Sequence, residues 1–197
     1  MRKVAVTGGL ACGKTTVCSL FKDMGAYVVS SDEIVHKLLS PSTDIGKKVI
    51  DFLGRDIVVD QQIDRSQIAR KVFQHADLLK GLEEIIHSAV QKEIDKHYLD
   101  AKKNKQVKLF LAEVPLLFET GSERYYDAVI VVVAKESVSK ERFFSRTQCM
   151  NDEYERRSAR QLQVSDKQAK ADYVIMNQGN FEELKVKVKE LFNQLTQ

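Results

Sequence analysis

The sequence predicts an α/β fold with a parallel sheet, and three observations lead to that prediction. Residues 3–7 are a β-branched apolar run that ends at two glycines, which is typical of a buried strand entering a turn. A helix is expected next, over residues 13–24, and residues 27–30 have the pattern of a second strand. Strand, helix and strand in this order form a right-handed crossover, so we expect the strands to lie parallel in one sheet.

The middle of the chain has a helical pattern over residues 34–105. It is clearest between Leu82 and Ile94, where apolar residues recur every three or four positions and form one stripe. Asp64 and Gln67 are a typical start for a helix within this block.

Strand signals return three more times, at residues 107–114, 128–134 and 173–176. The run at 128–134 is nearly all β-branched, so we expect that strand to be central and buried on both faces. Two helices complete the pattern. Ser165 and Gln168 have the spacing of a capping box for a short helix, and Asn180 precedes a C-terminal helix whose apolar stripe runs to Leu195.

The expected core is therefore a three-layer α/β/α unit with a central five-stranded parallel sheet, interrupted by a helical insertion and by a basic lid region. We expect substrate specificity to reside in these two interruptions. The core is assigned to residues 1–33, 106–135 and 166–197, the substrate-binding insertion to 34–105 and the lid to 136–165.

Composition narrows the class of protein. The 197 residues suffice for one core, and no apolar run approaches the roughly 20 residues that span a bilayer, so no membrane partner is expected. A net charge of +3 is too small to predict by itself that the protein binds nucleic acid. The three cysteines have no C-x-x-C spacing, which favours a location in the reducing cytoplasm and argues against structural zinc. The N-terminus lacks the longer apolar segment of a secretion signal, so secretion is not expected.

Residues 8–15 read GGLACGKT and fit the pattern G-x-x-x-x-G-K-[ST] directly between the first strand and the first helix. Glycines in this setting let successive backbone N–H groups face phosphate oxygens, and the helix N-terminus adds partial positive charge. We therefore expect a P-loop NTPase-type fold in which Lys14 reaches the β- and γ-phosphates and Thr15 ligates Mg²⁺. The alternative, a glycine-rich turn with an exposed lysine, explains fewer of these positions.

A GTPase is the competing interpretation, because Asp51 and Gly54 spell D-x-x-G and Asn104-Lys105 begins N-K-x-D. The first pair lies in a helical-looking segment, and Val107 replaces the aspartate of the second. ATP is therefore the expected nucleotide.

The phosphate loop and several later motifs together resemble the dephospho-coenzyme A kinase family over nearly the whole chain. The stretch EVPLLFE at residues 113–119 is the most distinctive of them after the loop. The other matches, in chain order, are residues 31–34, residues 64–73, Arg142 with Arg146, Arg157 with Gln161, and residues 171–179.

The resemblance implies transfer of the ATP γ-phosphate to the ribose 3′-hydroxyl of dephospho-coenzyme A, the last step of coenzyme A biosynthesis. It implies Asp32, Lys14 and Arg142 as catalytic residues, and Thr15 and Glu113 as magnesium ligands. Implied nucleotide contacts are Gly8, Gly9, Ala11, Cys12, Gly13, Lys14, Thr15, Thr16, Arg146 and Asn177. Implied contacts with the acceptor substrate are Asp32, Arg65, His87, Pro115, Leu116, Glu119, Arg157 and Gln161.

Several of these residues have a second interpretation. Asp32 is also a favourable acid for a helix N-terminus, and the arginines can be solvated surface residues. His87 can be a packed or exposed residue beside the apolar stripe, and Glu119 can orient the backbone near Pro115 instead of contacting substrate.

Three positions depart from the family pattern: Ser88 follows His87 where proline is expected, Glu113 replaces aspartate, and Cys12 replaces a small residue. Loop amides and Lys14 predict a thiolate at Cys12, and hence a regulatory site.

Two other functions stay open, a nucleoside or nucleotide monophosphate kinase and a nucleotide-dependent module that grips nucleic acid through residues 135–170. We expect a small-molecule acceptor, no nucleic-acid partner and a monomer.

Overall fold

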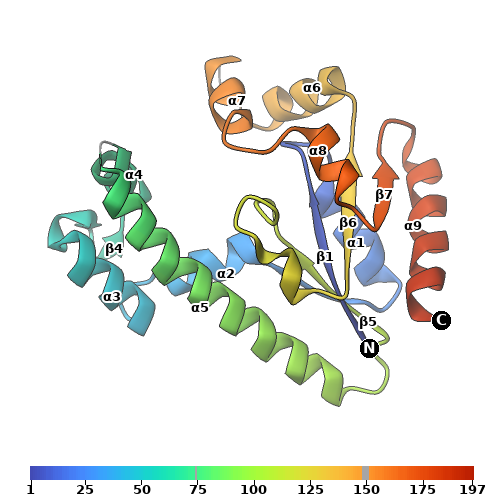
Figure 1. The fold of residues 1–197 in the computed structure, drawn as a ribbon, viewed down its shortest axis with the longest axis horizontal. Helices are drawn as coiled ribbons and strands as arrows, with labels where there is room; N and C mark the ends of the chain where they lie inside the picture. Colours follow the sequence, from blue (N-terminus) through green and yellow to red (C-terminus); the bar gives the residue numbers. More distant parts are fainter. Residues whose placement is uncertain (74, 148–150) are drawn as a thin grey trace. The chain divides into compact units, whose positions relative to one another are not determined.

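The computed structural model describes residues 1–73, 75–147 and 151–197 and divides into two compact units. One unit contains residues 1–30 and 98–197, and the other contains residues 31–97. Figure 1 shows the elements of both units along the chain.

The first unit is built on a five-stranded sheet in the order β2-β5-β1-β6-β7, with every neighbouring pair parallel. The strand β1 is central, and its Val6 lies opposite Glu113 of β5 on one side and Ile130 of β6 on the other. The predicted five-stranded parallel sheet is confirmed. Its strands are β1 (Arg2–Gly8), β2 (Tyr27–Ser30), β5 (Leu109–Glu113), β6 (Ala128–Val133) and β7 (Tyr173–Met176).

Alternate residues of the central strands face two separate cores, as the period of two in a strand requires. Val4 and Val6 pack with α1 (Lys14–Asp23) and α9 (Phe181–Thr196), which cover one face of the sheet (Figure 1). Ala5 packs on the other face with Leu117, beneath the segment that follows β5 and near α8 (Val164–Ala169). Burial on both faces explains why β6 is apolar throughout.

The predicted lid region forms two helices, α6 (Glu136–Thr147) and α7 (Asn151–Ser158). Lys140 joins them, because its ammonium lies 2.8 Å from a carboxylate oxygen of Glu136 and 2.8 Å from one of Glu155. Between the helices the Tyr154 ring packs edge-on against Phe143, with centroids 5.4 Å apart. The two helices therefore form one packed pair.

The second unit is largely helical and has its own apolar core, which includes Val49, Ile57 and Leu82. Its α5 is a single helix of 28 residues that continues into the first unit. The helices are α2 (Ser31–Leu38), α3 (Asp44–Leu53), α4 (Arg65–Phe73) and α5 (Ala76–Lys103), with short 3-10 turns at Arg55–Ile57 here and Ser122–Tyr125 in the first unit.

A hairpin of β3 (Val58–Val59) and β4 (Gln62–Ile63) was not predicted. Its two turn residues, Asp60 and Gln61, have φ of 49° and 61°, a left-handed conformation that glycine or asparagine normally marks. With neither residue present, the sequence carried no hairpin signal.

Two of the predicted helix starts are confirmed. The Asp64 carboxylate accepts a hydrogen bond from the Ser66 amide at 2.7 Å, and the Asn180 side chain accepts one from the Glu183 amide at 2.9 Å. The capping box at Ser165 is wrong. The helix α8 begins one residue earlier, at Val164, because its first turn closes on the Gln163 carbonyl and Val164 packs into the core.

The D-x-x-G segment lies in α3 and its C-cap and does not follow a buried strand, as expected. Within the described ranges, no helix has both the length and the hydropathy needed to cross a bilayer.

Candidate functional site

The loop between β1 and α1 depends on glycine at two positions. Gly8 has φ of +148°, and a Cβ there would lie 2.1 Å from the Val132 carbonyl oxygen. Gly13 has φ of +93°, and a Cβ would lie 2.2 Å from the Asn177 side-chain nitrogen. Ala11 is also left-handed, with φ of 52°. The loop is thus closely packed against Val132 and Asn177, with no room for side chains at Gly8 and Gly13. Its amides lie at the N-terminus of α1, where anions are favoured.

Lys14 is the first residue of α1 and is only 9% exposed. Its ammonium donates a hydrogen bond to the Gly9 carbonyl at 2.8 Å, so the side chain lies back across the loop. A cation in this position adds to the positive potential of the amides, as binding of a polyphosphate requires. Thr16 follows on the first turn and is partly buried.

Thr15 and Glu113 come together at the carboxyl edge of the sheet, where the Thr15 hydroxyl donates to Glu113 Oε1 at 3.1 Å. Hydroxyl and carboxylate oxygens are ligands that Mg²⁺ prefers, and this ion is usually held by one or two protein groups together with phosphates and water. The described residues contain no cluster of three His, Cys, Asp or Glu side chains suited to a metal. The pair therefore fits a magnesium ion that arrives with a nucleotide.

The Cys12 carbonyl is the point where the loop meets two distant segments. The Asn177 side chain donates to it at 2.8 Å, and Arg142 of α6 donates to it at 3.4 Å and to the Asn177 carbonyl at 3.3 Å. Arg142 and Asn177, both predicted for the site, thus contact the phosphate loop. The side chain of Arg146 lies outside the described residues.

The prediction of a thiolate at Cys12 is wrong. The side chain is 1% exposed, and its burial raises the pKa of the thiol above the ordinary value of 9.0, although nearby Lys14 lowers it. Desolvation of the charged form outweighs the attraction of the lysine, so Cys12 is a packed thiol. Burial likewise raises the pKa of Cys18, the next cysteine.

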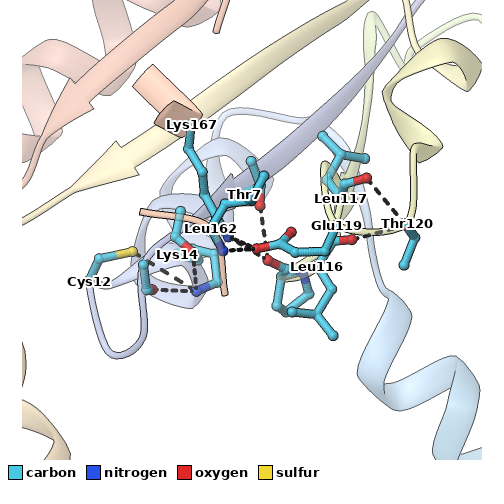
Figure 2. Close-up of polar contacts among 12 residues, drawn as sticks. Thr7, Cys12, Lys14, Leu116, Leu117, Glu119, Thr120, Leu162 and Lys167 are labelled. Carbon is cyan, nitrogen blue, oxygen red and sulfur yellow. Dashed lines mark hydrogen bonds and ion pairs between the residues drawn. The ribbon is translucent and has the colours of Figure 1, made fainter. Parts of the chain in front are cut away.

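The segment after β5 is held by a lysine that sequence analysis did not single out (Figure 2). Lys167 of α8 is fully buried, and its ammonium lies 2.8 Å from Glu119 Oε1 and 3.2 Å from the Pro115 carbonyl oxygen. The same Glu119 oxygen accepts from the Leu162 amide at 2.8 Å. Of the two roles left open for Glu119, these contacts fit the orientation of backbone, while Leu116 is 41% exposed. Nothing in the sequence around Lys167 indicates its burial, because it lies between Asp166 and Lys170 in a short, mostly polar segment.

A cavity of about 410 Å³ lies beside the phosphate loop in the first unit. Gly9, Leu10 and Cys12 line it from the loop, Tyr154 and Ser158 from α7, and Gln161 from the segment that follows. Arg157, the other predicted residue of this segment, is exposed and pairs with Glu153 on its own helix, with 2.7 Å between Nε and Oε1.

In the second unit, Asp32 is exposed in the first turn of α2, so it also satisfies the helix-terminus interpretation. The Arg65 guanidinium lies 3.2 Å from His36 Nδ1, which must accept because the guanidinium only donates. His87 is exposed within α5. Ser88 in place of proline lets this helix continue, since proline would remove a backbone donor there.

Comparison of the sequence with those of known proteins identifies relatives of this chain. The sequence profile of the family described as dephospho-CoA kinase matches residues 2–183. A dephospho-CoA kinase of Protochlamydia amoebophila is 45% identical, covering 99% of this chain and 97% of the relative. The dephospho-CoA kinase of Chlamydia pneumoniae is also 45% identical, covering 96% of this chain and 94% of the relative.

Solved structures give the same picture. A Thermus thermophilus protein is 26% identical, with a TM-score of 0.84 over 100% of this chain and 98% of its own. The dephospho-CoA kinase from Campylobacter jejuni is 25% identical, with a TM-score of 0.71 over 98% of this chain and 96% of its own. A shikimate kinase from Acinetobacter baumannii shares the fold. It is 15% identical, with a TM-score of 0.53 over 98% of this chain and 94% of its own.

Proposed function

The chain belongs to the dephospho-CoA kinase family, and on that premise we propose that it transfers the γ-phosphoryl group of ATP to the ribose 3′-hydroxyl of dephospho-coenzyme A. The products are coenzyme A and ADP. The observation that carries the proposal is the phosphate loop after β1, with buried Lys14 at its helix N-terminus, within a chain that matches the family over residues 2–183.

In the proposed reaction, the acceptor oxygen forms a bond to the γ-phosphorus while the bond from that phosphorus to the β–γ bridging oxygen breaks. The hydroxyl proton passes to the Asp32 carboxylate. Because the transferred group needs little covalent assistance, positioning and charge neutralisation dominate the chemistry. Loop amides, Lys14 and Arg142 supply donors for the phosphate oxygens.

Thr15 and Glu113 would hold Mg²⁺ in this scheme. When bound, the ion neutralises charge on the phosphate oxygens. The oxygens of these two residues lie 3.1 Å apart, and their hard-ligand chemistry supports the assignment.

The remaining roles follow the family resemblance. Residues 34–105 would receive the acceptor and residues 136–165 would act as the lid over the nucleotide. Acceptor contacts are proposed for Arg65, His87, Pro115, Leu116, Arg157 and Gln161, while Glu119 takes the role of orienting the backbone near Pro115. Nucleotide contacts are proposed for Gly8, Gly9, Ala11, Cys12, Gly13, Lys14, Thr15, Thr16, Arg146 and Asn177. A monomer in the cytoplasm is part of the proposal.

A phosphate-transfer assay with matched acceptors tests the proposal. Purified protein with ATP and Mg²⁺ is given dephospho-coenzyme A, AMP, CMP or shikimate, and formation of ADP and of the phosphorylated product is followed. We expect turnover with dephospho-coenzyme A alone. Preferred turnover of AMP or CMP would replace the proposal by a monophosphate kinase, and salt-dependent RNA or DNA binding without turnover would replace it by a regulatory module.

A further inference from the structure

Lys167 is a buried cation that the proposed reaction does not use. Its side chain is 0% exposed, although it belongs to the short helix α8. A buried ammonium is costly unless it is paired and hydrogen-bonded, so its partners indicate what this position is for.

Among the residues that the structure describes, both partners of the Lys167 ammonium belong to the segment that leaves β5. They are Glu119 Oε1 at 2.8 Å and the Pro115 carbonyl oxygen at 3.2 Å. The Pro115 carbonyl has a second donor, the Thr7 hydroxyl at 3.1 Å, and Thr7 is the last residue before Gly8 of the phosphate loop. The ammonium and the hydroxyl thus tie the start of the loop to this segment through one carbonyl (Figure 2).

Glu119 extends the connection to the segment that follows α7. Its Oε1 also accepts from the Leu162 amide at 2.8 Å, beside Gln161. Its Oε2 is buried and has no hydrogen-bond partner among the described residues, so the carboxylate depends on Lys167 and on one amide. Removal of Lys167 alone would leave this carboxylate buried without a countercharge.

The contacts determine the path of residues 113–116. Leu117 and Phe118 are buried in the core, whereas Glu113 meets Thr15 at one end of this path and Leu116 is 41% exposed at the other. The Pro115 carbonyl lies between these two residues. An apolar side chain at position 167 would fill the same space but could not hold that carbonyl or the carboxylate.

We propose that Lys167 is a positioning residue for phosphoryl transfer. By holding the Pro115 carbonyl and Glu119, it sets the segment of residues 113–116, which carries Glu113 and Leu116, at a fixed place relative to the phosphate loop. This inference rests on the proposed function, since that function assigns Glu113 to the metal and Leu116 to the acceptor. The alternative is that the pair contributes to stability only.

The two roles are separated by removing both charges together. Lys167→Met alone leaves the Glu119 carboxylate buried without a countercharge, so we expect the melting temperature of this variant to fall by several degrees. Glu119→Gln/Lys167→Met leaves no buried unpaired charge, and we expect it to recover most of the loss, because replacing both partners of a buried pair is often nearly neutral. Lys189→Met is the matched control, since Lys189 is an exposed lysine of α9, outside the segment that Lys167 holds.

Kinetics of the double variant decide the proposal. Loss of positioning predicts a kcat/KM for dephospho-coenzyme A that is about 10- to 100-fold lower, the scale of a small misplacement, with the Kd of ATP unchanged in calorimetry. Wild-type kinetics with wild-type melting temperature would overturn the positioning role. If the double variant does not fold, Lys167→Gln is assayed at low temperature, where the folded form persists although the Glu119 carboxylate has lost its countercharge, and unchanged kinetics there overturn the proposal equally.

The wild-type assay keeps the two proposals apart. Absence of wild-type turnover with dephospho-coenzyme A contradicts the proposed function itself. Normal wild-type turnover that survives loss of Lys167 contradicts the positioning role alone.

Discussion

The Thr15 hydroxyl donates a hydrogen bond to Glu113 Oε1 across 3.1 Å, although the two residues lie 98 positions apart in the chain. The parallel register explains the contact, because Val6 lies opposite Glu113 and both strands end at the same edge of the sheet. Two hard oxygens therefore meet beside the phosphate loop.

Glu113→Gln should raise the Mg²⁺ concentration that gives half-maximal turnover by about 10-fold or more, because an amide oxygen carries no charge for the metal. Turnover measured over a magnesium titration tests this, and chelation of the metal with EDTA should abolish turnover of the wild type. Glu182→Gln, at an exposed acid in α9, is the control. An unchanged magnesium dependence in Glu113→Gln would remove Glu113 from the metal site.

Asp32→Asn should retain ATP affinity and lose at least ~100-fold in kcat, since the amide cannot accept the proton of the acceptor hydroxyl. Steady-state kinetics with a separate ATP titration check both parts. The neighbouring Glu33→Gln should keep normal turnover. If Asp32 serves only the helix terminus, its variant will instead show a small loss of melting temperature with normal kcat.

Arg142→Ala should lower kcat by about 100-fold, because it removes a charged donor that lies 3.4 Å from the Cys12 carbonyl of the loop. Arg142→Lys should restore little of this, since an ammonium lacks the planar fork of a guanidinium. ATP turnover is to be compared in Arg142→Ala, Arg146→Ala and Arg160→Ala, the last at an exposed arginine near the end of the lid region. Normal kinetics in both of the first two would end the lid hypothesis.

Cys12 should react slowly with iodoacetamide at neutral pH, because burial raises the pKa of its thiol and the thiolate is the reactive form. Each unit of increase lowers the thiolate fraction about 10-fold. Timed alkylation followed by peptide mass spectrometry, with urea-unfolded protein as reference, measures this. Equal rates in the folded and unfolded protein would show that the thiol is accessible and ionised.

The same raised pKa has a consequence for stability. Above pH 9.0, the ordinary value for a thiol, unfolded chains ionise Cys12 while folded chains keep it neutral, so the free energy of unfolding should fall as pH rises through that range. Below that pH both states hold the proton, and Cys12 contributes no pH dependence. A Cys12→Ala variant, compared by denaturant titration at neutral and alkaline pH, isolates this contribution.

Local patterns sufficed for the elements that position the nucleotide. The apolar run before Gly8 predicts β1, and Asn180 predicts the start of α9, because each signal lies within a few residues of the structure it specifies. The β3–β4 hairpin escaped prediction because Asp60 and Gln61 adopt left-handed conformations without glycine. The start of α8 was predicted wrongly because packing of Val164 overrides the capping preference of Ser165.

What the sequence by itself determined is the phosphate loop, the parallel sheet and the family, since a glycine pattern, strand periodicity and ordered motifs are all written along the chain. Only the tertiary structure decided the state of two ionisable side chains. Cys12, predicted as a thiolate, is a buried thiol, and Lys167, which looks like one surface lysine among several, is a buried partner of Glu119. Desolvation and ion pairing depend on neighbours that are remote in the chain, so no local pattern specifies them.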